Sequence, residues 1–221
     1  MRSFDQIFDI AAGRKGGAEA LNAMLSQPKP AAELAAIPDD RWLSAMTRGV
    51  FQAGFNWKVV ENMWPGFEAA FDGFDIGRCA MLNDEDFERL VSDTRIIRNG
   101  AKIRSVQENA LFVRDLARQS GSAGKAIADW PSTDFIGLLD LFKKRGSRLG
   151  GTTGQYCLRG QGKDSFILSQ SVVDRLIAEG VVDKAPTSKK ALADVQAAFN
   201  VWMEQSGRSL TEISRVLGMS L

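Results

Sequence analysis

Apolar residues recur every three or four positions along most of this chain, and this spacing is typical of amphipathic α-helices. The longest such stretch covers residues 100–119, and we expect it to form the central helix of the fold. Alternating polar and apolar runs are short and β-branched clusters are few, so no strand is predicted. The sequence therefore predicts an all-α fold with about ten helices.

Local signals give the expected ends of several helices. Asp40 is a predicted cap for a helix from Arg41 to about Gly54, and Pro65 and Gly66 are expected to interrupt the next helix. A helix is predicted over residues 165–179, with Gly180 as its C-cap. The run from Ser209 to Glu212 is a capping box that opens a last short helix.

Composition limits the classes of site that this chain can build. It contains 28 basic and 27 acidic residues, so binding to DNA would need a local basic face rather than a basic protein. There is no histidine, which excludes histidine-based acid–base catalysis and every histidine-containing zinc site. Cys79 and Cys157 form no CxxC motif. We predict no metal site, no membrane segment and a cytoplasmic location.

A Gly-rich region over residues 146–164 fits a helix–hairpin–helix arrangement that grips a phosphate. Two segments compete for the hairpin, residues 149–153 and residues 158–163. We favour the first because basic residues precede it; the second would then be a connecting loop. The predicted DNA contacts are Gly150, Gly151, Thr152, Thr153, Lys144, Arg145 and Lys163. Ordinary helix C-caps and a solvated basic face are the competing interpretation.

Asp164 lies at the predicted start of an apolar helix. A carboxylate there could stabilise an oxocarbenium-like sugar cation, or orient a water molecule, during cleavage of an N-glycosidic bond. Aspartate is also a preferred N-cap residue, so a structural role competes. The two roles do not exclude each other.

The segment from Gln52 to Trp57 places an aromatic turn between two predicted helices. An enzyme that acts on a base must extrude the base and hold it by stacking. Trp57 is the predicted wall of a base pocket, Phe55 a wedge that fills the vacated stack, and Gln52 and Asn56 the partners of a base edge. The competing interpretation is that Trp and Phe at helical spacing are core residues, and we expect this for most of the five tryptophans, with Trp57 alone exposed in a cleft.

Taken together, these segments resemble the DNA-3-methyladenine glycosylase I family, within the helix-hairpin-helix glycosylase superfamily. The family pattern Q-A-G-[LF]-[SN]-W is similar to residues 52–57, the F-D segment to 71–75, G-I-I-R-x-x-x-K-I to 95–103, and K-K-R-G-x-x-x-[VG]-G-T-T to 143–153. Residues 164–167 are similar to the Asp-Thr-His-Val segment that carries the catalytic aspartate of the wider superfamily.

The chain departs from the family pattern in three ways. The acidic residue that recognises the methylated base in the family corresponds to Gly49. The family's N-terminal Tyr-His-Asp-x-Glu-Trp-Gly segment has no counterpart. The family's zinc clamp of two cysteines and two histidines cannot form here, so we expect a divergent member without zinc.

The resemblance implies a two-lobed fold like that of the helix-hairpin-helix DNA glycosylases. We expect a single domain over residues 1–221, with divergent N-terminal helices in 1–40, a glycosylase core in 41–185 and C-terminal helices in 186–221 that close a lobe.

The resemblance also implies a function in base-excision repair. The expected enzyme is a monofunctional DNA glycosylase that flips an alkylated purine out of double-stranded DNA and hydrolyses its N-glycosidic bond. Asp164 would be the catalytic residue, and the enzyme would be a monomer without a cofactor, apart from an alkali cation at the hairpin. The alternatives are a non-catalytic DNA-binding protein on the same scaffold and an all-α interaction or regulatory module.

Overall fold

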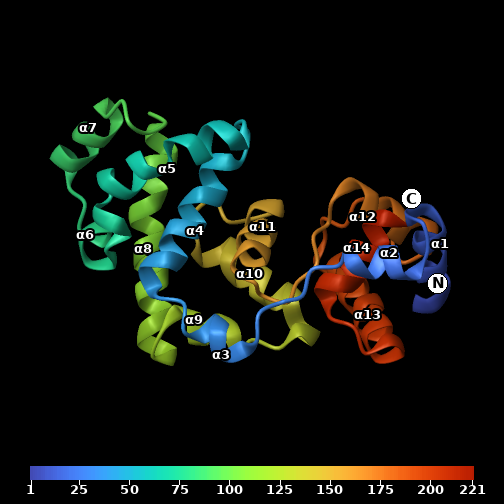
Figure 1. The fold of residues 1–221 in the computed structure, drawn as a ribbon. Coiled ribbons are helices and arrows are strands. Elements are labelled where there is room, and N and C mark those ends of the chain that lie inside the picture. The colour runs from blue at the N-terminus through green and yellow to red at the C-terminus, as the bar shows by residue number, and fades with distance from the viewer. The chain divides into compact units, whose positions relative to one another are not determined.

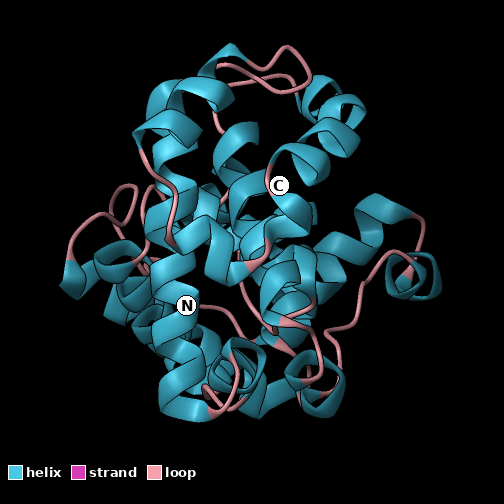
Figure 2. Ribbon diagram, turned by 90° about the vertical axis from the view of Figure 1, so that its left-hand side faces the viewer, coloured by secondary structure: helices cyan, strands magenta, loops and turns pink.

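The computed structural model describes residues 1–221, and its regular secondary structure is entirely helical (Figure 2). There are fourteen α-helices and two 3-10 helices, so the predicted all-α class is confirmed. The predicted number of about ten helices matches the longer elements, because several of the others have only five or six residues. No helix is both long and apolar enough to span a membrane.

The chain forms two compact units (Figure 1). Unit 1 comprises residues 1–29, 131–137 and 162–221, and unit 2 comprises residues 30–130 and 138–161. The helices of unit 1 are α1 (Phe4–Lys15), α2 (Ala18–Ala23), η2 (Ser132–Asp134), α12 (Gln170–Ala178), α13 (Lys189–Ser206) and α14 (Leu210–Met219). Those of unit 2 are α3 (Ala31–Ala35), α4 (Asp39–Gln52), α5 (Trp57–Ala70), η1 (Asp72–Phe74), α6 (Ile76–Ala80), α7 (Asp84–Ser92), α8 (Gly100–Ser120), α9 (Ala123–Ala128) and α11 (Thr152–Gln161). Helix α10 (Phe135–Arg145) starts in unit 1 and continues in unit 2.

The core of unit 1 is built around a ring cluster. Phe166 stacks on Phe199 with 4.5 Å between the ring centroids, and its ring meets Phe135 edge-on at 4.9 Å. The segment that carries Phe166 is not helical, so the helix predicted from residue 165 begins only at Gln170.

Hydroxyl groups of α14 explain why this segment stays extended. The N–H of Ser165 donates to Thr211 Oγ1 at 3.2 Å, and the N–H of Ile167 donates to Ser214 Oγ at 3.0 Å. The main chain therefore finds hydrogen-bond partners without forming a helical turn. The predicted capping box at the start of α14 is present, with Ser209 and Glu212 bonded reciprocally.

Unit 2 is organised around α8, the predicted central helix. This helix packs against α4, α6 and α9, which surround it in Figure 1. Its apolar side chains Ile103, Val106 and Val113 are fully buried. The helix ends one residue later than predicted, at Ser120.

Two predicted helix boundaries in unit 2 are wrong. Helix α4 begins at Asp39 after Pro38 and has no side-chain cap, so the predicted cap Asp40 lies inside the first turn, where its carboxylate pairs with Arg41. Helix α5 runs through Pro65 without a break. Gly66 allows this helix to approach the main chain of Arg95, since a Cβ there would lie 2.2 Å from the Arg95 carbonyl oxygen.

A hairpin over residues 146–151 joins α10 to α11; it overlaps the favoured segment 149–153 but begins three residues earlier, and residues 152–153 already belong to α11. Asn109 of α8 fixes it: Nδ2 donates to the Ser147 carbonyl at 3.1 Å, and Oδ1 accepts from the Ser147 N–H at 2.7 Å. Gly151 has a φ of 60°, a conformation that favours glycine. The competing segment over 158–163 forms the last turn of α11 up to Gln161, so the second hairpin candidate is wrong.

Lys102 of α8 holds the end of α4 in a similar way. Its Nζ donates to the carbonyl of Ala53 at 2.6 Å and to that of Phe51 at 3.3 Å, and it lies 4.6 Å from the centre of the Phe55 ring. Burial, together with the charge of Arg148, lowers the pKa of Lys102. Through these two hydrogen bonds, the ammonium group satisfies carbonyls that the end of a helix leaves unpaired.

Replacing Asn109 by alanine should loosen the hairpin. It leaves two main-chain groups of Ser147 without a partner, which should lower the free energy of unfolding by about 1–3 kcal/mol. Urea unfolding measures this change, with Asn62→Ala on the exposed side of α5 as the matched control. Equal stability of the two variants would contradict the proposed role of Asn109.

Replacing Lys102 by methionine should release the turn after α4. Methionine keeps the apolar stem but removes the donor, so amide hydrogen exchange at residues 53–56 should become faster by about tenfold or more. The control is Lys58→Met, because the Lys58 side chain is exposed. Unchanged exchange in the Lys102 variant would show that the turn is held by other contacts.

Candidate functional site

The turn between α4 and α5 exposes aromatic rings that a folded core would normally bury. Trp57 is 50% exposed and Phe55 is 42% exposed, and the fold buries Trp42, Trp64 and Trp202. The Trp57 ring meets the ring of Tyr156 on α11 edge-on, with 5.4 Å between the centroids and 87° between the planes. Tyr156 is itself 40% exposed. This pair offers apolar surface on which a planar ligand can stack.

Polar side chains of α4 and α5 form a small network near the turn that carries Trp57. Gln52 Nε2 donates to Glu61 Oε1 at 2.8 Å, and the nearest nitrogen of Arg48 lies 3.6 Å from Glu61 Oε2. Asn56, predicted to contact a base, is the N-cap of α5: its Oδ1 accepts from the N–H of Lys58 at 2.9 Å. Base contact by Gln52 and Asn56 stays a prediction.

An ion-pair network joins α4 to α5 below this turn. Glu68 accepts bonds from Arg41, Ser44 and Trp64, at 2.9 to 3.0 Å. Burial opposes ionisation of Glu68, but these donors outweigh it and the net effect lowers the pKa of the carboxyl group. The guanidinium of Arg48 lies over the Trp64 ring at 4.4 Å, which adds a cation–π contact.

Gly49 lies where α4 packs against α11. A Cβ at this position would lie 3.6 Å from Thr153 Cγ2 and 3.7 Å from Cys157 Cβ. These are ordinary packing distances, so an alanine would fit, whereas a long acidic side chain would start in the contact between the two helices. The residue that resembles the family's acidic position therefore contributes packing.

The basic residues near the hairpin fall into two groups. Lys144 pairs with Asp140 and Arg145 with Asp115, so the two predicted phosphate contacts already have acidic partners. Lys143 and Arg148 have no ion pair and are exposed. Thr152 is exposed at the start of α11, and Gly150 lies against the stem of Lys143. DNA contact by these residues stays a prediction, as it does for Gly151 and Thr153.

Asp164 caps a helix, but not the helix that the sequence suggested. Its Oδ1 accepts from the N–H of Thr211 at 2.9 Å, and its Oδ2 lies 3.3 Å from the N–H of Leu210, both at the start of α14. The carboxylate is thereby fixed in orientation, and the catalytic role stays a prediction. Neighbouring Lys163 is only 4% exposed, whereas a phosphate contact would need an exposed ammonium group.

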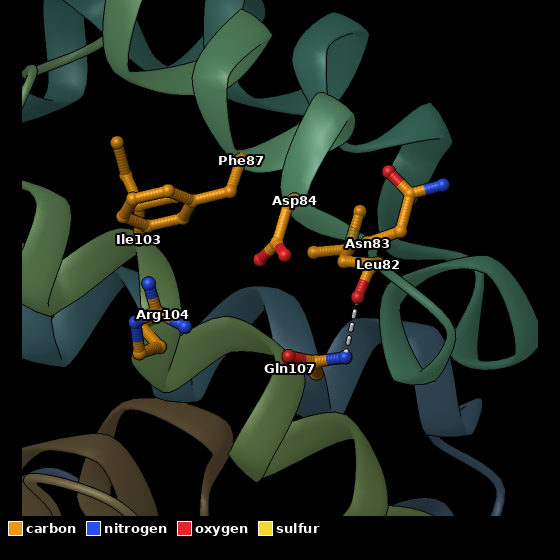
Figure 3. Close-up of a pocket in the computed structure, with 7 residues that line it drawn as sticks. All are labelled: Leu82, Asn83, Asp84, Phe87, Ile103, Arg104 and Gln107. Atoms are coloured by element: carbon orange, nitrogen blue, oxygen red, sulfur yellow. Dashed lines mark hydrogen bonds between the residues drawn. The ribbon is translucent and has the colours of Figure 1, made fainter.

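A cavity between α7 and α8 lies at a different place in unit 2 (Figure 3). It is lined by Leu82, Asn83, Asp84, Phe87, Ile103, Arg104 and Gln107. Gln107 donates to the Leu82 carbonyl at 2.7 Å, and the guanidinium of Arg104 lies 4.3 Å from the centre of the Phe87 ring. Its volume of about 40 Å³ suits water rather than a base.

The two cysteines are buried and apart, and burial raises the pKa of each thiol to about 12. No group of three or more His, Cys, Asp or Glu side chains is placed to hold a metal ion.

Sequence reasoning missed Glu61, Tyr156, Lys102 and Asn109 as contributors to this region. Tyr156 is the chain's single tyrosine and follows the Gly-Thr-Thr motif, and Glu61 lies one helical turn after Trp57. Both positions can be seen in the sequence, but the side chains that Tyr156 and Glu61 contact lie on other helices.

Part of the chain is similar in sequence to known methyladenine glycosylases. Residues 37–134 match the methyladenine glycosylase family. The chain is 41% identical over 59 residues to DNA-3-methyladenine glycosylase 1 of Escherichia coli (strain K12), a match that covers 27% of this chain and 32% of that protein. The match thus spans about a third of that relative's length.

Two solved structures have a similar fold. The 3-methyladenine DNA glycosylase I of Staphylococcus aureus gives a TM-score of 0.51 at 18% identity, over 71% of this chain and 91% of that one. A variant of 3-methyladenine DNA glycosylase I in complex with 3-methyladenine gives 0.51 at 17% identity, over 66% and 85%. The chain is thus similar to the methyladenine glycosylase family in sequence over residues 37–134, and its helical fold is similar to that of the solved 3-methyladenine DNA glycosylases I.

Proposed function

We propose that this chain is a DNA glycosylase that removes an alkylated purine from double-stranded DNA. The observation that carries the proposal is the exposed pair of Trp57 and Tyr156, beside a turn that lies within the family match. Exposed aromatic surface costs free energy in water, and a stacked base would cover it. The named relatives are DNA-3-methyladenine glycosylases, which supports a purine of that kind as substrate.

The hairpin supports the DNA-binding part of the proposal. Gly151 has a left-handed φ and immediately precedes α11, which begins at Thr152. Glycine turns and the first N–H groups of a helix are common phosphate-binding elements. Lys143 and Arg148 lack acidic partners, so they are better candidates for contacts to the DNA backbone than the paired Lys144 and Arg145. Arg148, Arg104 and the first residues of α8 also line one open hollow beside the hairpin.

Asp164 is the proposed catalytic carboxylate. Two N–H donors from α14 hold it in one orientation, which reduces the reorganisation needed to stabilise a developing sugar cation. We infer a monofunctional hydrolysis, because the resemblance provides no well-placed lysine for a Schiff base. The chain has no histidine, so the family's zinc clamp is not part of the proposal.

A second function has an observation in its favour. Gly49 replaces the family's acidic residue, and both oxygens of Asp164 already accept main-chain bonds. These features fit a protein that binds damaged DNA and does not cleave the bond. Monomeric action in the cytoplasm is part of either proposal.

Replacing Asp164 by asparagine should abolish base release and keep the fold. The amide keeps one oxygen to accept from the N–H of Thr211 but loses the charge and the longer bond from the N–H of Leu210, so thermal unfolding is measured to check that the variant is folded. We expect release of methylated purine from alkylated duplex DNA to fall by about a hundredfold or more. Asp183→Asn is the control, because Asp183 is exposed in the same unit. Release that persists in the Asp164 variant would remove this residue from the mechanism, and binding without release by the wild type would favour the second function.

Replacing Trp57 by alanine should weaken the grip on the extruded base. Stacking contributes about 1–3 kcal/mol per base, so kcat/KM for base release should fall by about tenfold to a hundredfold. Trp57→Phe keeps an aromatic face and should retain most of the activity. Similar rates for all three proteins would mean that the base is held elsewhere.

A further inference from the structure

The surface around Trp57 needs a polar group if it is to distinguish one purine from another. Stacking on an aromatic ring tolerates every base, because each base has a π-face. Discrimination requires hydrogen bonds to the base edge, and these are costly to lose when buried. Position 49 cannot supply one, since glycine has no side chain and α11 covers its Cβ direction.

Glu61 is the carboxylate that α5 places next to Trp57. The two residues are four positions apart on one helix, so their side chains lie on the same face as neighbours. The Glu61 side chain is 45% exposed, so its oxygens are accessible to a ligand.

Two residues of α4 fix the direction of this carboxylate. Gln52 donates to Oε1 at 2.8 Å, and Arg48 lies 3.6 Å from Oε2 while its guanidinium stays over Trp64. A carboxylate has about four lone-pair sites, so these two contacts leave acceptor capacity. The carboxylate is thus oriented before any ligand arrives, which reduces the entropy lost on binding.

We propose that Glu61 is a specificity-determining residue that selects purines with an exocyclic amino group. This rests on the proposed function, in which a base stacks on Trp57. The amino group donates a charge-assisted hydrogen bond to Glu61, and a carbonyl at the same position would be repelled by the carboxylate.

Calorimetric titration with free bases tests this without relying on cleavage. The ligands are 3-methyladenine and 3-methylhypoxanthine, which have the same shape but carry an amino group or an oxygen at the same ring position. The proteins are the wild type, Glu61→Gln and the control Glu88→Gln, whose side chain lies exposed on α7. Thermal unfolding checks that each variant is folded, and release of both bases from duplex DNA is measured in parallel.

The wild type should prefer 3-methyladenine, and Glu61→Gln should reduce that preference by about tenfold to a hundredfold, the value of one charged hydrogen bond. Glu88→Gln should keep the full preference. A Glu61 variant that binds both bases less well by the same factor would overturn the inference, because a merely structural role changes affinity without changing selectivity.

The same data separate this inference from the proposed function. If the wild type releases methylated purine and Glu61→Gln keeps its selectivity, the inference on Glu61 fails and the glycosylase proposal stands. If the wild type neither binds a free base nor releases one from alkylated DNA, the proposed function fails and the inference fails with it.

Discussion

One face of the central helix determines the geometry of both loops that matter here. Lys102 and Asn109 lie two helical turns apart on α8, so they project from the same side. Lys102 donates hydrogen bonds to the carbonyls at the end of α4, and Asn109 forms hydrogen bonds with the N–H and the carbonyl of Ser147. Each is a polar side chain buried among apolar residues, and each is satisfied by main-chain atoms of a loop. The positions of the aromatic turn and of the hairpin are therefore both set by one rigid helix, α8.

The sequence predicted the elements whose stability is local. The central helix, the hairpin after α10 and the capping box of α14 all follow from periodicity, glycines or caps within a few residues. Residues 165–169 were predicted as helix because their composition is apolar. They are extended because Thr211 and Ser214 satisfy their N–H groups from about 46 residues away, which no local pattern reveals.

The candidate site divides in the same way. An exposed Trp57 could be inferred from an aromatic residue at a turn, and Trp57 is indeed exposed. The partners of Trp57 could not, because Tyr156 comes from α11 and the Gln52–Glu61 bond joins two helices. Asn56 was assigned to a base edge because amides suit that role, whereas its position before α5 makes it an N-cap first. The residue type indicates the chemistry of each side chain, whereas the residues that it contacts are determined by tertiary packing.

Gly49 and the aromatic pair follow from one packing arrangement. Without a side chain at residue 49, α11 can place Thr153 and Cys157 directly against α4. Tyr156 lies one helical turn after Thr153, so the same close approach carries its ring to Trp57. Residue 49 therefore offers no polar group to a base stacked on Trp57, whereas α5 carries the exposed carboxylate of Glu61 one turn after Trp57, held by Gln52.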